Sequence, residues 1–81
     1  MESIEVTVRF DLQGKAYPQQ FVRGGHVYVL TSTGRRWRDQ AGEHILVMTA
    51  EAKTFELVFD PRELRWYLNL AEASPKIALS S

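Results

Sequence analysis

The chain has 81 residues, its ten Lys and Arg balance ten Asp and Glu, and it contains no cysteine. This length allows one small domain with a modest core, and zero net charge gives no overall attraction to nucleic acid or membrane. The lack of cysteine excludes a disulfide framework, a thiolate zinc site and a cysteine nucleophile. The sequence shows no apolar span of about twenty residues and no signal peptide, so we expect a cytoplasmic protein with no membrane partner.

The first segment predicts a strand with one buried face. Apolar side chains at every second position of residues 4–12, including Phe10 and Leu12, alternate with polar ones, and this period of two is typical of a half-buried strand. Residues 13–15 then turn the chain, and Pro18 keeps the returning strand at an edge. Gly24-Gly25 accepts the positive φ of a two-residue hairpin turn.

The middle of the chain predicts further strands. The first covers residues 26–33 and continues past a bulge or bend at Gly34 to residues 35–38, and the others cover residues 44–49 and 54–60. The polar residues 39–43 form the turn that follows the first of them.

Residues 61–73 fit two structures. Asp60 and Pro61 make a good helix start, and Asp-Pro is equally good as a type I turn. Every second residue from 64 to 70 is Leu or Trp, including Leu64, Trp66 and Leu70, and this alternation favours a strand. We therefore predict a strand, with residues 1–73 as the domain and 74–81 as a flexible tail.

Six short strands separated by turns predict an all-β fold. We expect a small five- to six-stranded antiparallel barrel or sandwich of SH3-like or OB-like size, because closure leaves few unpaired strand edges. The alternative is an α+β fold with a C-terminal helix at about residues 61–73.

Charge is uneven along the chain although it sums to zero. Residues 23–38 carry four arginines and no acid, whereas residues 39–63 carry six acids against two cations. Arginine grips phosphate oxygens and aromatic rings stack on unpaired bases, so this hairpin predicts a single-stranded nucleic-acid surface. Its candidate residues are Arg23, Tyr28, Arg35, Arg36, Trp37 and Arg38. In the alternative, these arginines pair with the acidic neighbours and Trp37 lies in the core.

Two strands are apolar on both faces, so only one face of each can line the core. Either the tail covers the other face, or it is exposed as a docking patch for a partner protein or a second copy. The candidate contacts of this alternative are Val27, Val29, Ile45 and Val47. It predicts a monomer or a weak dimer.

The sequence gives no sign of catalysis or of a cofactor. No catalytic motif is present, and the acids Glu56 and Asp60 are expected on an outward face in contact with water. The two histidines, His26 and His44, lie far apart without the ligand spacing of a zinc site. We therefore predict a protein that is not an enzyme and binds no metal or cofactor.

Four short motifs resemble a known family. They are Phe21-x-Arg23-x-Gly25-x-x-Tyr28-x-Leu30, Trp37-Arg38, Phe55-Glu56-Leu57-x-Phe59-Asp60 and Trp66-Tyr67-Leu68. Across about residues 9–70 the chain resembles a small bacterial β domain of unknown function, and also the C-terminal extension of the Y-family-polymerase-like subunit of bacterial mutagenic repair complexes. Arg23 departs from the pattern, which often has an aromatic residue there. The resemblance implies a non-catalytic accessory domain in DNA repair or replication, with single-stranded DNA or a repair or replication protein as its partner.

Overall fold

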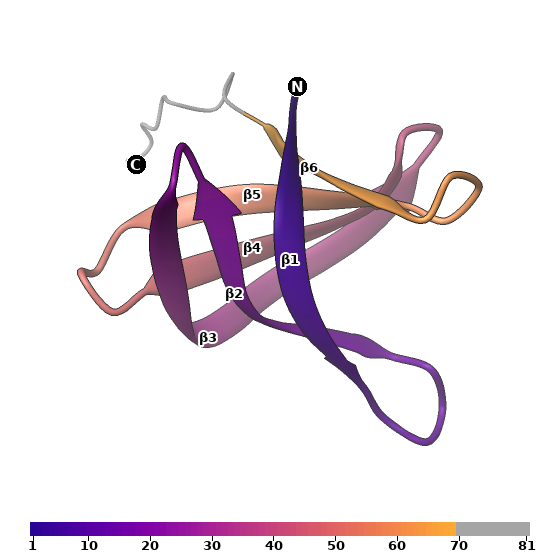
Figure 1. Ribbon diagram of the computed structural model, residues 1–81. Helices are drawn as coiled ribbons and strands as arrows, with labels where there is room; N and C mark the ends of the chain where they lie inside the picture. Colours follow the sequence, from indigo (N-terminus) through magenta and orange to yellow (C-terminus); the bar gives the residue numbers. More distant parts are fainter. Residues whose placement is uncertain (70–81) are drawn as a thin grey trace, which may run out of the picture.

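The computed structural model describes residues 1–69, and every regular element in that range is a β-strand. The six strands follow one another around a closed antiparallel barrel in which β6 returns to pair with β1 (Figure 1). They are β1 (Glu2–Phe10), β2 (Ala16–Arg23), β3 (His26–Asp39), β4 (Gly42–Thr49), β5 (Thr54–Asp60) and β6 (Arg65–Asn69). The expected small six-stranded all-β barrel is therefore confirmed, and none of the described residues belongs to a helix able to cross a membrane.

The helical alternative for the last segment is wrong over the described residues. The chain turns after Asp60, where the Leu64 amide donates to the Asp60 carbonyl oxygen at 2.8 Å, and then enters β6. Trp66 and Leu68 point into the barrel as the alternation predicted. Leu64 does not, because it occupies the turn with a φ of +57° and is 75% exposed. Leu70 and the predicted tail, residues 74–81, lie outside the described residues.

The core is built from the inward residues of all six strands. Several side chains are fully buried, and Phe21 among them stacks on Tyr28 with ring centroids 4.8 Å apart and meets Phe55 edge-on at 5.3 Å. Phe59 and Trp66 form a second ring pair with centroids 4.9 Å apart. The largest fully buried side chains are Phe21, Ile45, Leu57 and Leu68, and Val47, Val58 and Thr49 are also fully buried. Burial of these apolar surfaces is the main force that closes a barrel of this size.

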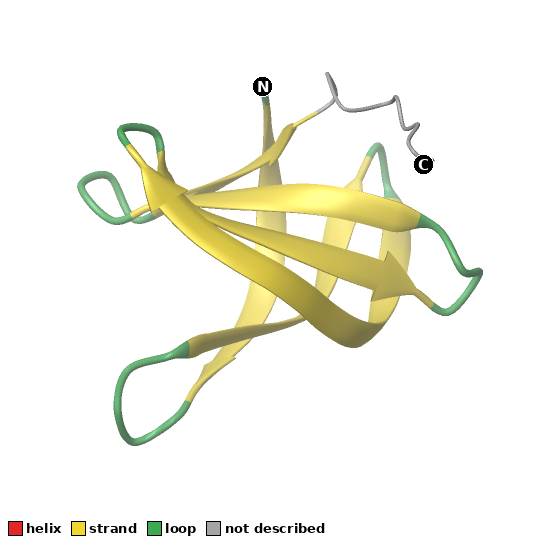
Figure 2. Ribbon diagram, turned by 180° about the vertical axis from the view of Figure 1, so that it is seen from behind, coloured by secondary structure: helices red, strands yellow, loops and turns green. Residues whose placement is uncertain are grey.

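Strand β3 is shared between two neighbours and so opens one end of the barrel. Residues 26–29 of β3 pair with the end of β2, whereas residues 30–39 pair with β4 across two register shifts. The first residues of β2 consequently lie away from β3, and the β1–β2 hairpin projects from the barrel body (Figures 1 and 2). The expected bulge at Gly34 is confirmed by the register shift between Thr33 and Arg36.

This projection corrects the predicted burial of two residues. The inward residues of β1 pack on the core as far as Val8. Beyond that point Phe10 is 53% exposed and Leu12 fully exposed, because the hairpin has left the barrel. The alternation of residues 4–12 therefore predicted the strand correctly but overestimated the length of its buried face.

Candidate nucleic-acid interface

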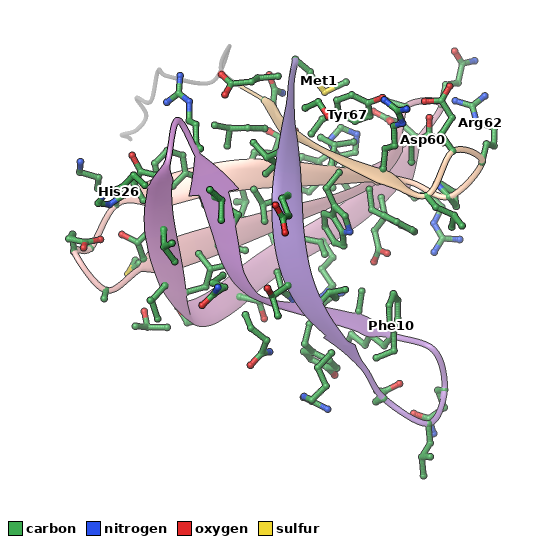
Figure 3. All side chains as sticks on the ribbon, in the orientation of Figure 1. Met1, Phe10, His26, Asp60, Arg62 and Tyr67 are labelled. Atoms are coloured by element: carbon green, nitrogen blue, oxygen red, sulfur yellow. The ribbon has the colours of Figure 1, made fainter. Side chains whose placement is uncertain are left out.

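A hollow of about 420 Å³ lies at the end of the barrel opened by the projecting hairpin. The hairpin contributes Phe10 and Ala16 to its wall. The β3–β4 turn contributes Arg38 and Asp39, and Arg62 follows β5. Figure 3 shows Phe10 on the hairpin, pointing toward the end of the barrel that carries Asp60 and Arg62. The hollow thus places one exposed aromatic ring opposite a rim of charged side chains.

Three turns surround this end of the barrel, and an aspartate stabilises each of them. Asp11 accepts the amides of Gln13 and Lys15 in the β1–β2 turn. Asp39 accepts the Ala41 amide in the β3–β4 turn, and Asp60 the Arg62 amide before β6, each at 2.9 Å. Asp and Asn favour such turns because the side chain replaces a backbone acceptor. The backbone amide of Lys15 lowers the pKa of Asp11, and that of Arg62 lowers the pKa of Asp60.

A cluster of cations surrounds Tyr17, on the face of the β1–β2 hairpin opposite Phe10 and Ala16. The guanidinium carbons of Arg9 and Arg36 lie 4.6 and 5.0 Å from the centroid of the Tyr17 ring, and Lys15 Nζ lies 5.7 Å away. We call these four residues the Tyr17 cluster. The ring attracts each cation, but the cations also repel one another.

Arg36 joins the Tyr17 cluster to the hollow. Its Nη2 donates to the Ala16 carbonyl oxygen at 2.6 Å, across the space between β2 and β3. Its Nη1 lies 3.4 Å from Glu43 Oε2. Within residues 1–69, Arg9, Lys15 and Arg38 form no ion pair with a carboxylate. These three cations are therefore available to an external anion.

A buried histidine lies behind the rim, on the outer face of β4. His44 is only 6% exposed. Its Nδ1 is 2.6 Å from Glu56 Oε2, and its Nε2 is 2.8 Å from Asp39 Oδ1. Burial by itself lowers the pKa of His44, but the hydrogen bonds to Glu56 and Asp39 outweigh it, and the pKa is raised above its ordinary value. The same contact with His44 lowers the pKa of Asp39.

This network corrects our prediction for the acids of β5. Glu56 and Asp60 do lie on the outward face, but they are 8% and 9% exposed, not solvated. Glu56 binds His44 and also accepts a hydrogen bond from Asn69 Nδ2 at 3.1 Å. Outward-facing residues of four adjacent strands thus form a small second layer on the outside of the barrel.

The structure brings together only some of the predicted nucleic-acid residues. Arg36 and Arg38 lie at the open end, one in the Tyr17 cluster and the other on the wall of the hollow. Arg35 and Trp37 lie on the opposite, outer face of β3, where the Arg35 guanidinium is 5.1 Å from the Trp37 ring centroid. Their separation follows from the alternation of side chains along a strand.

The other two predicted residues lie elsewhere. Arg23 is at the far hairpin turn, where its Nε contacts Glu2 at 3.1 Å. Tyr28 packs against the core, stacked on Phe21. The expectation that Tyr28 offers an exposed stacking face is therefore wrong, because the inward face of β3 begins with this residue.

The predicted protein-docking residues divide between surface and interior. Val27 and Val29 are 46% and 51% exposed on the outer face of β3. Ile45 and Val47 are buried in the core, so they cannot form a docking surface. The exposed apolar residue of β4 is instead Met48, at 42% exposure. The predicted exposed face is therefore the exposed one in β3, with Val27 and Val29, and the buried one in β4, with Ile45 and Val47.

Several residues of the site were not identified from the sequence. These are Phe10, Arg9, Lys15, Tyr17 and the pair His44–Glu56. The pairing of Arg9 with Tyr17 could have been predicted from the sequence. Once the turn at residues 13–15 is assigned, hairpin pairing places Arg9 opposite Tyr17, as the structure shows. The approach of Arg36 had no such signal, because it depends on the bend of β3.

The described residues contain no group of three or more His, Cys, Asp or Glu side chains arranged to hold a metal ion.

No protein-family model matches the chain, and no curated protein or solved structure is significantly similar to it. What the fold and the site define is a small closed β-barrel with a hollow, partly cationic open end.

Proposed function

We propose that this protein is a non-enzymatic binding module that holds single-stranded nucleic acid across the hollow and the Tyr17 cluster. The observation that carries the proposal is the gathering of Arg9, Lys15 and Arg36 around one tyrosine ring, where within residues 1–69 only Arg36 forms an ion pair with a carboxylate. Like charges held this close raise the energy of the free protein, and a bound anion relieves that repulsion. A phosphate backbone supplies such anions at regular spacing.

The hollow favours a single strand over a duplex. Phe10 presents a half-exposed ring at its wall, and an unstacked base gains about 1–3 kcal/mol from stacking on an aromatic side chain. Arg38 lies on the same wall without an ion-pair partner among the described residues, so it can contact the adjoining phosphate. Bases in a duplex are already stacked and cannot enter such a hollow without unpairing.

Two further considerations set the strength and the setting of the binding. Zero net charge predicts modest affinity, since only the local cluster attracts the strand. The resemblance to a domain of bacterial mutagenic repair complexes supports a role in DNA repair or replication, which we include in the proposal.

The proposal is tested with a fluorescently labelled oligothymidylate and anisotropy at low salt. Arg38→Glu should weaken binding about tenfold, because it replaces an attraction to phosphate with a repulsion. Lys53→Glu makes the same change of charge in the β4–β5 turn, at the other end of the barrel, and should have little effect. With about three phosphate contacts, log K should fall with log salt with a slope of about −2. Equal losses in the two variants, or no binding by the wild type, would contradict the proposal.

A second candidate function is protein docking through the outer face of β3. The exposed side chains of Val27 and Val29 favour it, and Met48 extends the apolar surface. Apolar docking depends little on salt, unlike phosphate binding. If the face pairs with a second copy, sedimentation should show a weak dimer that Val29→Asp abolishes and Lys53→Glu does not. A monomer at every concentration would rule out self-association.

A further inference from the structure

We propose that His44 makes ligand binding at the hollow dependent on pH. The protonated imidazole forms an ion pair with the Asp39 carboxylate, and the neutral imidazole does not. Asp39 belongs to the wall of the hollow, so loss of the imidazolium charge leaves the Asp39 carboxylate uncompensated where an anionic strand would bind. The inference rests on the proposed function, because it describes the regulation of the same site.

The two contacts of His44 require two ring protons. Nδ1 faces Glu56 at 2.6 Å and Nε2 faces Asp39 at 2.8 Å. An ionised carboxylate only accepts hydrogen bonds, and a neutral imidazole has a single N–H to donate. Only the imidazolium can therefore satisfy both acids at once, and loss of one proton sets a nitrogen lone pair against a carboxylate oxygen.

The different burial of Glu56 and Asp39 determines which of the two hydrogen bonds the neutral imidazole loses. The Glu56 side chain is 10% exposed, whereas that of Asp39 is 52% exposed. A buried carboxylate has little water to stabilise its charge and depends on its hydrogen-bond donors, whereas an exposed one is stabilised by water. The neutral ring therefore keeps its proton on Nδ1 for Glu56. Asp39 loses its contact with the ring but keeps the Ala41 amide, so its charge stays at the rim.

Among the described residues that surround the His44 ring, Asp39 and Glu56 are the hydrogen-bond partners of its nitrogens. Trp37 stacks on the imidazole with centroids 5.0 Å apart and an interplanar angle of 10°, and Arg35 lies over that indole. Asp60 already binds Arg62 and Tyr67 binds Glu63, so neither supplies a proton acceptor to the ring. The charged and titratable groups facing His44 from the neighbouring strands are Asp39 and Arg35 of β3, Glu56 and Asp60 of β5, and Arg65 and Tyr67 of β6.

The transition lies above the ordinary pKa of a histidine. The hydrogen bonds raise the pKa of His44 above its ordinary value of about 6.5 despite the burial that lowers it. The protein should thus bind the strand more tightly below this transition than above it. By reciprocity, a bound anionic strand should raise the affinity of His44 for its proton by the same factor.

The test measures oligothymidylate binding by anisotropy from about pH 6 to about pH 9, where thymidylate phosphodiesters keep a constant charge, at fixed ionic strength. We expect the wild-type dissociation constant to rise about three- to tenfold over this range, the effect of one unit charge at contact distance in a partly exposed site. His44→Gln should remove most of this rise. Asp39→Asn, which removes the rim carboxylate and leaves His44, should bind more tightly than the wild type at high pH and move the midpoint of the profile to lower pH, because the ring loses one of the two acids that raise its pKa. His26→Gln is the matched control, because His26 packs on Tyr28 at the opposite end of the barrel and should leave the wild-type profile intact (Figure 3).

Two results would overturn the inference. In the first, His44→Gln and Asp39→Asn retain the wild-type pH profile while Arg38→Glu still weakens binding. This result would support the proposed binding site and refute its regulation by His44. In the second, NMR of the free protein shows the ring nitrogens of His44 titrating while the carboxyl carbon of Asp39 does not respond. Failure of the proposed function looks different: the wild type does not bind at any pH, and both conclusions then fall.

Discussion

The β3–β4 turn depends on one glycine, and replacing it should cost much of the stability of the protein. Gly42 has a φ of +138°, and a Cβ at that position would lie 2.1 Å from the carbonyl oxygen of Phe59 and 2.9 Å from its carbon. Both are backbone atoms of the neighbouring strand, so no side-chain rotation relieves the contact. Relief requires β4 to move away from β5 where Glu43 pairs with Phe59.

The magnitude follows from two contributions. A side chain in this region of φ costs about 1–3 kcal/mol, and forcing an atom into a filled space costs about 1–3 kcal/mol more. We therefore expect Gly42→Ala to lower the free energy of unfolding by about 4 kcal/mol. A domain of this length has about 4–12 kcal/mol in all, so the variant should lose at least a third of it.

Gly24→Ala separates the two contributions. Gly24 also has a positive φ, +58°, but a Cβ there meets nothing within 4 Å. Its replacement should cost about 1 kcal/mol from the backbone conformation alone. Urea unfolding followed by tryptophan fluorescence gives both values, and thermal unfolding should show a decrease of about 4–8 °C for each kcal/mol. If the two variants differ by less than about 1 kcal/mol, the close approach of β4 and β5 is not what makes Gly42 necessary.

Three further predictions concern the core, the exposed ring of Phe10 and the buried histidine. Phe21→Ala should lower the free energy of unfolding by about 3–5 kcal/mol, because it empties the centre of the aromatic core. Phe10→Ala should change it by less than about 1 kcal/mol while weakening oligothymidylate binding, and a large loss of stability there would show that Phe10 is a core residue after all. His44 has a raised pKa in the folded protein, so its contribution to stability is complete below the unfolded value of about 6.5 and is lost as the pH rises through the folded value. Urea unfolding across this range should show the difference between wild type and His44→Gln shrinking with rising pH, and a constant difference would contradict the assignment.

The local features of the fold followed from the sequence. The alternation in residues 4–12 and 64–70 predicted strands, and Gly24-Gly25 predicted the hairpin turn that the positive φ values confirm. Each of these features depends on a few neighbouring residues. The alternation of side chains determines the face that each one takes, and glycine tolerates the left-handed backbone of the turn. Such preferences act within one strand or one turn, so neighbouring residues in the sequence are enough to reveal them.

The long-range features required the closed barrel. Tyr28 and Val29 are both good strand residues, and only closure of β3 onto β2 and β4 decides that Tyr28 faces the core. Arg36 meets Tyr17 because β3 bends at its register shifts and leaves a space beside β2. His44 meets Glu56 through the pairing of β4 with β5.

The sequence by itself determined the strands, the turns and the balance of charge, because these depend on side-chain alternation and local backbone preference. Only the tertiary structure decided which apolar face became the core, which cations were left without partners and which histidine was buried between two acids. The physical reason is that burial and charge pairing depend on distances between residues far apart in the chain, and those distances are fixed only when all six strands have closed.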